Sequence, residues 1–267
     1  MATTRKKLTP AQASLQRAQA RLAHAAVQAS VTGEMRHGPA QTRPQVAATA
    51  LAVSSPFSAQ GNAYQLMLAQ LAEHRAALKE IKSVERKAEF KAAILPVYDA
   101  WVDGVLASDK PGEDFVFTTA LIWHIDAGHY ARAWQLARHA LAHAMPLPPT
   151  YERDLATALI DEYAWAFLAG KMTAAEALEI LPQVLETTQP FDAPDQARSK
   201  LHKALAYALL GREQGAQEVD YEALPLQALQ SALPLLRRAL ELDQQAGVKK
   251  DIERVERNLA KKEPPPA

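Results

Sequence analysis

Pairs of carboxylates are the residues of this sequence that could take part in metal-assisted chemistry. A nuclease holds Mg²⁺ between two or three converging carboxylates, because both the attacking and the leaving oxygen of the phosphodiester need charge neutralisation. Three pairs stand close together in the chain: Asp99 with Asp103, Asp161 with Glu162, and Asp192 with Asp195. Acid pairs at such spacing are common on the solvated faces of helices. The spacing therefore favours surface charge, and the sequence predicts no catalytic residue.

Histidines at helical spacing are the second group that could do chemistry. His139 and His143 lie four residues apart on one predicted helix, a spacing that can hold zinc. No glutamate follows the first histidine as it does in HExxH, and the sequence has no cysteine, so packing or surface roles are favoured. His124 and His129 flank a predicted turn and are expected at helix ends. The sequence predicts no metal site and no cofactor.

Glycine-rich phosphate-binding loops are also missing from this sequence. Neither GxxxxGK[ST] nor GxGxxG occurs, so ATP hydrolysis is not expected of this chain. With 267 residues and 48% hydrophobic side chains, the chain can bury one sizeable core or two modest ones. No apolar run of 18 residues and no secretory signal is present, and the lack of cysteine fits a reducing compartment. We expect a soluble cytoplasmic protein that does not contact a membrane.

The charge of the chain is segregated along its length. Residues 1–61 contain seven basic residues and one acid, Glu34, so this segment is near +6 although the formal net charge of the chain is zero. A basic arm on an acidic body is the pattern expected when the arm meets phosphate and the body meets protein. A solvated arm without a ligand remains the alternative. The predicted DNA-binding residues are Arg5, Lys6, Lys7, Arg17, Arg21, Arg36 and Arg43.

Two basic residues of the arm share a helix face, and basic residues of two later segments could also contact DNA. Arg17 and Arg21 share one face of a helix predicted from Thr9 to about Ser30, so both could meet one groove or backbone. Two later segments are also basic. The first contains Arg198, Lys200 and Lys203, and the second contains Lys249, Lys250, Arg254 and Arg257. Acidic residues alternate with the basic residues of the second segment, which favours an exposed, ion-paired face there.

A heptad-like apolar series begins at Tyr64. Its first three turns are the most regular, and charged residues occupy the outer face of the predicted helix. Such a helix can join copies of the chain in an oligomer or cover the chain's own core, and the sequence leaves both open. The predicted oligomerisation residues are Met67, Leu71, Leu78 and Ile81.

The rest of the chain reads as helix, with proline and glycine as breaks and almost no strand signal. We predict an all-α fold: a basic arm, a linker, a long coiled-coil-like helix and an irregular, tetratricopeptide-like array of helical hairpins without a strict repeat of roughly 34 residues. The predicted helices cover residues 96–107, 113–127, 129–145, 151–168, 173–187, 195–210 and 223–260, the last broken near Pro234 and Gly247. The predicted segments are the arm (1–32), a flexible linker (33–62), a helical oligomerisation region (63–110), a helical-hairpin domain (111–262) and a tail (263–267).

Several long strings are far more particular than an amphipathic helix requires. They are LDQQAGVKKDIERVERNLAKK from Leu242, YQLMLAQLAEHRAALKEIKS from Tyr64, ILPVYDAWVDGVL from Ile94, ALIWHIDAGHYARAWQLARHAL from Ala120 and PDQARSKLHKAL from Pro194. In this order they resemble the small terminase subunit of Peduovirus-type temperate tailed phages over roughly residues 60–262. Relatives often continue into a lysine-rich tail, whereas this chain stops at KKEPPPA.

The resemblance implies a role in viral DNA packaging in the host cytoplasm. A small terminase subunit is expected to bind double-stranded viral DNA at a cohesive-end or packaging-start site as a homo-oligomer. It then delivers that DNA to a large terminase subunit, which carries the ATPase and the cutting activity. Two alternatives remain: a helical-repeat adaptor that binds only protein, and a metal-dependent endonuclease, as the family's label of endonuclease subunit suggests.

Overall fold

The computed structural model describes residues 59–109, 111–214 and 218–262. The chain divides into two compact units, Met1–Gly61 and Asn62–Ala267, and the described residues belong almost entirely to the second. Every regular element in these ranges is helical, which confirms the all-α prediction. The predicted arm helix and linker lie outside the described residues. None of the described helices combines the length and the apolar character needed to cross a membrane.

Eleven helical segments follow one another along the described part of the chain. Because short connections join most of them, consecutive helices pack as neighbours. They are α2 (Ala59–Glu80), α3 (Val84–Ile94), the 3₁₀ helix η1 (Leu95–Val97), α4 (Asp99–Leu106), α5 (Phe115–Asp126), α6 (Tyr130–Ala142), α7 (Leu155–Leu168), α8 (Ala174–Thr188), α9 (Asp195–Leu209), α10 (Leu226–Leu242) and α11 (Lys249–Lys262).

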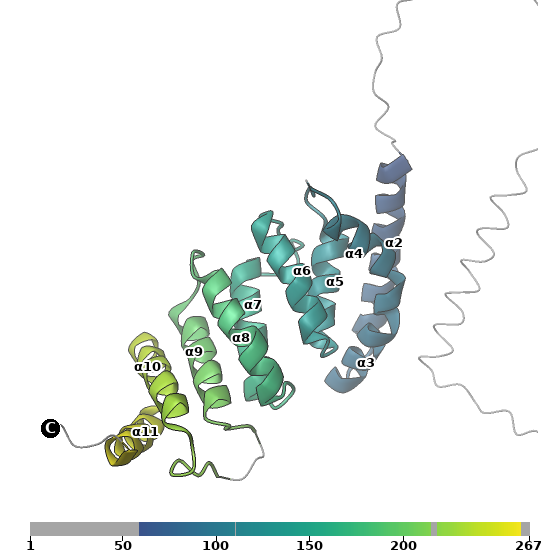
Figure 1. Cartoon of the computed structure of the whole chain (residues 1–267). Coiled ribbons are helices and arrows are strands. Elements are labelled where there is room, and N and C mark those ends of the chain that lie inside the picture. The colour runs from purple at the N-terminus through teal and green to yellow at the C-terminus, as the bar shows by residue number, and fades with distance from the viewer. Residues whose placement is uncertain (1–58, 110, 215–217, 263–267) are drawn as a thin grey trace, which may run out of the picture. The chain divides into compact units, whose positions relative to one another are not determined.

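Three helical hairpins form the centre of the larger unit. Helix α5 packs on α6, α7 on α8 and α9 on α10, while α7 also contacts α9 and α6 contacts α8. Figure 1 shows these hairpins side by side, with α2, α3 and α4 at one end of the row and α11 at the other. Helices α3 and α4 pack on α5, so the packing is continuous across residue 110. The hairpins therefore share one apolar core.

The first helices of the three hairpins repeat at a constant interval. They begin 40 residues apart, at Phe115, Leu155 and Asp195. A glycine with positive φ follows each of them, because the chain turns there through the left-handed conformation that glycine adopts without strain. These glycines are Gly128, Gly170 and Gly211. The interval is longer than the roughly 34 residues of a tetratricopeptide repeat, and the tetratricopeptide-like detail is not confirmed.

Side-chain caps fix where several helices begin. The Asp114 carboxylate accepts from the Phe117 amide at 2.8 Å and starts α5, and the Asp154 carboxylate accepts from the Thr157 amide at 2.9 Å and starts α7. Thr173 forms a full capping box with Glu176 at the start of α8. Each cap satisfies an amide that the helix itself cannot.

Two predicted helix boundaries are wrong. The predicted coiled-coil-like helix from Tyr64 is two helices, because Ser83 is extended and its hydroxyl accepts from the Arg86 amide to start α3. Pro234, by contrast, lies inside α10 and does not end it. Apolar residues buried on both sides of this proline outweigh the backbone hydrogen bond that a proline removes. They are Leu229, Ala232, Leu236 and Ala239, each 0% exposed.

A buried carboxylate joins α11 to the rest of the array. Asp251 is 3% exposed and accepts from the Tyr207 hydroxyl of α9 at 2.8 Å and from the Tyr221 hydroxyl at 3.1 Å. Arg212 forms an ion pair with the same carboxylate. Burial raises the pKa of Tyr207 and of Tyr221, and Asp251 raises both further, so both hydroxyls keep their protons and donate.

We predict that Asp251→Asn lowers the free energy of unfolding by about 1–3 kcal/mol, because charge-assisted hydrogen bonds lose their charge in a buried site. Urea denaturation followed by circular dichroism measures this change. Glu253→Gln is the matched control on the exposed face of α11 and should change stability by less than about 0.5 kcal/mol. Equal stability of both variants would show that the network contributes nothing to the fold.

Candidate functional site

The residues predicted to bind DNA lie outside the part of the chain that the structure describes. All of them fall within residues 1–58: Arg5, Lys6, Lys7, Arg17, Arg21, Arg36 and Arg43. Their role stays a prediction from the sequence. The described unit, which begins at Asn62, carries the acidic balance of the charge segregation.

The apolar stripe of α2 packs largely inside the chain itself. Leu71 is 4% exposed and Leu78 is 8% exposed, while Met67 and Ile81 are half-buried. Leu66, on another face of α2, is 71% exposed. The stripe therefore covers the chain's own core, one of the two uses that the sequence left open. Its use as a contact between copies stays a prediction.

Aromatic contacts fix α2 against its neighbours. The Tyr64 ring stacks on Trp101 with centroids 5.6 Å apart, and the Tyr64 hydroxyl accepts from the Phe115 amide at 3.1 Å. His74 Nδ1 and the Tyr98 hydroxyl share a hydrogen bond of 2.7 Å. Burial lowers the pKa of His74. These polar contacts are satisfied within one chain, which supports an intramolecular role for this face.

A cleft of about 450 Å³ lies between α3, η1, α4, α5 and α6, and we call it the Asp99 cleft. It brings together the first predicted carboxylate pair and the histidines that flank the α5–α6 turn, which the sequence did not predict. Its lining residues are Ala92, Leu95, Pro96, Asp99, Asp103, His124, His129 and Arg132.

The polar groups of the Asp99 cleft pair with one another. His124 Nδ1 and His129 Nδ1 are 3.2 Å apart, so one nitrogen donates and the other accepts. Burial, followed by the charges of His129 and Arg132, lowers the pKa of His124 to about 4 and keeps it neutral at neutral pH. Arg132 forms an ion pair with Asp103.

A divalent cation does not fit the Asp99 cleft as it stands. Such an ion requires several converging oxygen or imidazole donors. Over residues 59–109, 111–214 and 218–262, no three histidine or acidic side chains stand close enough to share a metal ion. Asp103 already pairs with Arg132, and the two histidines bind each other.

The other two carboxylate pairs singled out in the sequence do not line the Asp99 cleft. Arg153 contacts Asp161 at 2.9 Å and Glu162 at 3.0 Å, which makes this acid pair part of a surface ion-pair group. Asp192 and Asp195 are exposed. These acids act as surface charge, in agreement with their spacing.

The His139 and His143 rings lie against each other, with centroids 4.5 Å apart. His139 also contacts Phe117. Burial lowers the pKa of His139, with a smaller effect from His143, so the neutral ring is favoured in this packing. His139 therefore takes part in aromatic packing with His143 and Phe117.

The four tryptophans divide between core and surface. Trp123 is 3% exposed and Trp134 is 4% exposed, and the Trp134 ring nitrogen donates to Gln183 at 3.0 Å. Trp101 stacks on Tyr64, as described above. Trp165 is 55% exposed on α7. Three of the four therefore act as packing residues, in agreement with their helical spacing.

A second cleft, of about 640 Å³, opens between α8, α9 and α10, and we call it the Arg198 cleft. The sequence singled out Arg198 within ARSKLHKAL but not His202 or Arg238. The spacing of Arg198 and His202, one helical turn apart, was a signal available in the sequence; Arg238 comes from another hairpin helix. The lining residues are Pro182, Leu185, Glu186, Gln189, Arg198, His202, Leu205, Arg238 and Leu242.

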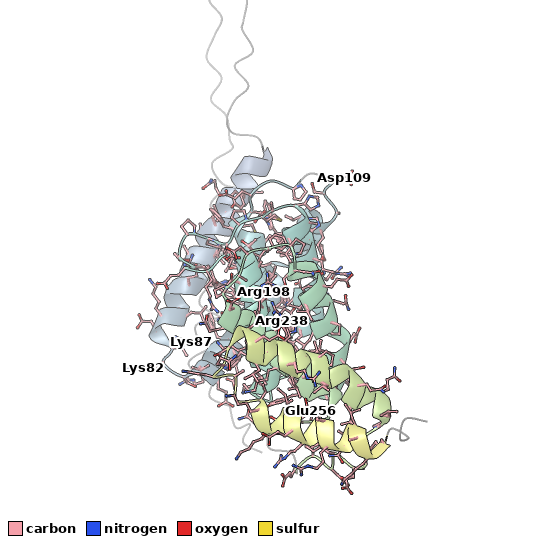
Figure 2. The ribbon with its side chains drawn as sticks, turned by 90° about the vertical axis from the view of Figure 1, so that its left-hand side faces the viewer. Lys82, Lys87, Asp109, Arg198, Arg238 and Glu256 are labelled. Atoms are coloured by element: carbon pink, nitrogen blue, oxygen red, sulfur yellow. The ribbon has the colours of Figure 1, made fainter. Side chains whose placement is uncertain are left out.

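Figure 2 labels Arg198 and Arg238 near each other, and both line the cleft between α8, α9 and α10. On α11, Arg254 pairs with Glu218 at 3.1 Å, and Glu256 of the same helix pairs with Arg237 at 2.7 Å. The charged side chains of α11 are therefore partly ion-paired, as their alternation in the sequence predicts.

Comparison with known proteins identifies the family. A family model described as phage small terminase subunit matches residues 68–196. The protein named "Terminase, endonuclease subunit" of Escherichia phage P2 is 36% identical over 204 residues, which cover 76% of this chain and 76% of that protein. No solved structure matches the chain. The residues that the family model matches include the whole lining of the Asp99 cleft and the α8 side of the Arg198 cleft. The chain belongs to the phage small terminase subunit family, with a role in phage DNA packaging.

Proposed function

We propose that this protein recognises viral DNA during packaging and delivers it to the large terminase subunit. It binds the cohesive-end or packaging-start region of double-stranded viral DNA as a homo-oligomer. The large subunit then supplies ATP hydrolysis, cutting and translocation. In this division of labour the small subunit acts by assembly and positioning.

The charge segregation of the chain carries this proposal. Residues 1–61 hold seven basic residues against one acid, and the packed unit that follows is acidic overall. Basic side chains bind DNA by neutralising phosphates and releasing counterions. An adaptor that binds only protein has no need of such an arm. Membership of a family that acts in phage DNA packaging supports this assignment of the arm.

The requirement for a separate motor subunit follows from the sequence. It contains no phosphate-binding loop of the GxxxxGK[ST] type, whereas packaging consumes ATP in such a loop. The relative from phage P2 is itself named a subunit of a terminase. A partner with the motor activity is therefore part of the proposal.

We predict that the basic arm supplies most of the DNA affinity. Deleting residues 1–58 should abolish most binding to cohesive-end DNA and leave the helical content of the remaining chain intact. Replacing Arg17 and Arg21 by Ala should flatten the slope of log affinity against log salt by about 1–2, since each phosphate contact contributes about 0.9. Gel shift and fluorescence anisotropy at several salt concentrations measure both effects.

The matched control for the arm replaces Gln16 and Gln19 by Ala, which changes the same segment without changing its charge. This variant should keep the slope of the parent chain. Full affinity in the chain that lacks residues 1–58 would instead place DNA binding on the helical unit.

We predict a homo-oligomer at tens of micromolar, measured by light scattering. Leu71 and Leu78 are unsuitable for testing the contact, because a buried aspartate at either position would unfold the chain itself. Leu66→Glu places a charge on the exposed face of α2 and should weaken assembly if α2 joins the copies. Gln65→Glu, at the neighbouring exposed position, is the matched control. A monomeric parent chain at these concentrations would contradict the prediction.

We predict that the purified protein hydrolyses neither ATP nor DNA in the presence of Mg²⁺. The sequence lacks a phosphate loop, and among the described residues no three histidine or acidic side chains stand close enough to share a metal ion. Plasmid nicking and phosphate release are the measurements. Nicking that persists through purification and is lost in Asp99→Asn would establish the endonuclease alternative.

A further inference from the structure

The Arg198 cleft is preformed by three packed helices. Pro182, Leu185 and Glu186 come from α8, and Arg198 and His202 come from α9. Arg238 and Leu242 complete the cleft from α10. Because α9 packs against both α8 and α10, the walls are held by the core of the array. A rigid cleft loses little entropy when it receives a partner.

The cationic side of the cleft is incompletely neutralised. Arg198 donates to the backbone carbonyls of Thr188 and Phe191 near the end of α8, and no carboxylate of the described residues pairs with it. Arg238 pairs at 2.9 Å with Glu241, on the surface of the same helix. Both side chains of that pair are more than half exposed, and exposed pairs of this kind hold each other weakly. A partner's carboxylate can therefore compete for Arg238.

His202 reports the sign of the potential within the cleft. Burial, followed by the positive charges of Arg238 and Arg198, lowers its pKa to about 4. Its Nδ1 atom is buried and has no hydrogen-bond partner among the residues that the structure describes. Glu186 is the only acid in the lining of the cleft, and it lies on the exposed edge. The cleft favours an anionic group from outside.

The apolar floor of the cleft distinguishes between an acidic protein segment and DNA. Leu185 and Leu242 are half-buried and Leu205 is 6% exposed, so the cleft offers aliphatic surface below its guanidinium groups. The sugar–phosphate backbone of DNA presents mainly charged oxygens and no aliphatic side chain of the length needed to cover this surface. A protein segment presents apolar anchors and carboxylates together, the combination that forms the centre and rim of protein interfaces.

We propose that the Arg198 cleft is the surface that receives an acidic, partly apolar segment of the large terminase subunit. The apolar side chain of that segment rests on Leu185 and Leu242, and its carboxylate pairs with Arg238 and Arg198. This inference rests on the proposed function, since it places the delivery step of that function on a defined surface. The basic arm is left free to hold DNA.

The test reverses a single charge in the full-length chain. We expect Arg238→Glu to weaken binding of the purified large terminase subunit at least about tenfold, because the variant sets like charges against each other. Arg237→Glu is the matched control on the adjacent position of α10, which does not line the cleft; it breaks the exposed ion pair with Glu256 but should bind the large subunit like the parent chain. Glu186→Gln removes the one acid of the lining and should tighten binding by about two- to threefold. Biolayer interferometry against immobilised large subunit measures all three.

Circular dichroism and cohesive-end DNA affinity of the same variants separate the possible failures. Equal binding of the large subunit by the parent chain, Arg238→Glu and Arg237→Glu overturns the cleft assignment and leaves the proposed function intact. No binding of the large subunit by the parent chain overturns the delivery step and the cleft assignment together. Loss of DNA affinity in Arg238→Glu with unchanged binding of the large subunit would make the cleft a phosphate site and also overturn the inference.

Discussion

The complete burial of α5 is the constraint on which the rest of the helical unit depends. Every side chain from Val116 to Ile125 is buried, so this helix has no face for solvent. A helix that is apolar all round must be covered on all sides. Helix α6 covers one side, while α3, η1 and α4 cover another. Helix α2 in turn packs on these covering helices, through Tyr64 on Trp101 and His74 on Phe90 and Tyr98, and its Leu71 and Leu78 are buried within a single copy.

The same packing produces the two clefts. Each cleft lies where three or more helices meet, and charged side chains contribute to its lining. In the Asp99 cleft these groups satisfy one another, through Arg132 with Asp103 and His124 with His129. In the Arg198 cleft, within the described part of the chain, the guanidinium of Arg198 meets only backbone carbonyls and Nδ1 of His202 has no hydrogen-bond partner. The polar groups of the Asp99 cleft are paired with one another, whereas those of the Arg198 cleft are incompletely paired. This difference is the physical reason to assign a partner to the Arg198 cleft.

Local sequence patterns predicted the helices more accurately than they predicted the residues that line the clefts. Helix periodicity, together with proline and glycine breaks, predicted most helices from α4 to α9 to within a few residues. The same patterns missed the start of α3 at Ser83, where a cap competes with continued helix, and the continuity of α10 through Pro234, where burial on both sides overrides a local rule. The 40-residue interval between the first helices of the hairpins was not predicted, because the second helices and their connections vary in length and obscure the repeat in the sequence. Neither cleft was predictable, since each combines residues from three or more helices whose contacts depend on the whole array.

The proposed division of labour, with DNA on the basic arm and protein contacts on the packed helical unit, requires specific recognition of viral DNA. Nuclease-protection footprinting of the full-length protein on DNA that spans the cohesive-end region measures this recognition. We expect one discrete protected segment near the packaging start at near-physiological salt, absent from a scrambled duplex of equal length. Protection that is uniform along the DNA, or absent at concentrations where the protein is assembled, would contradict it.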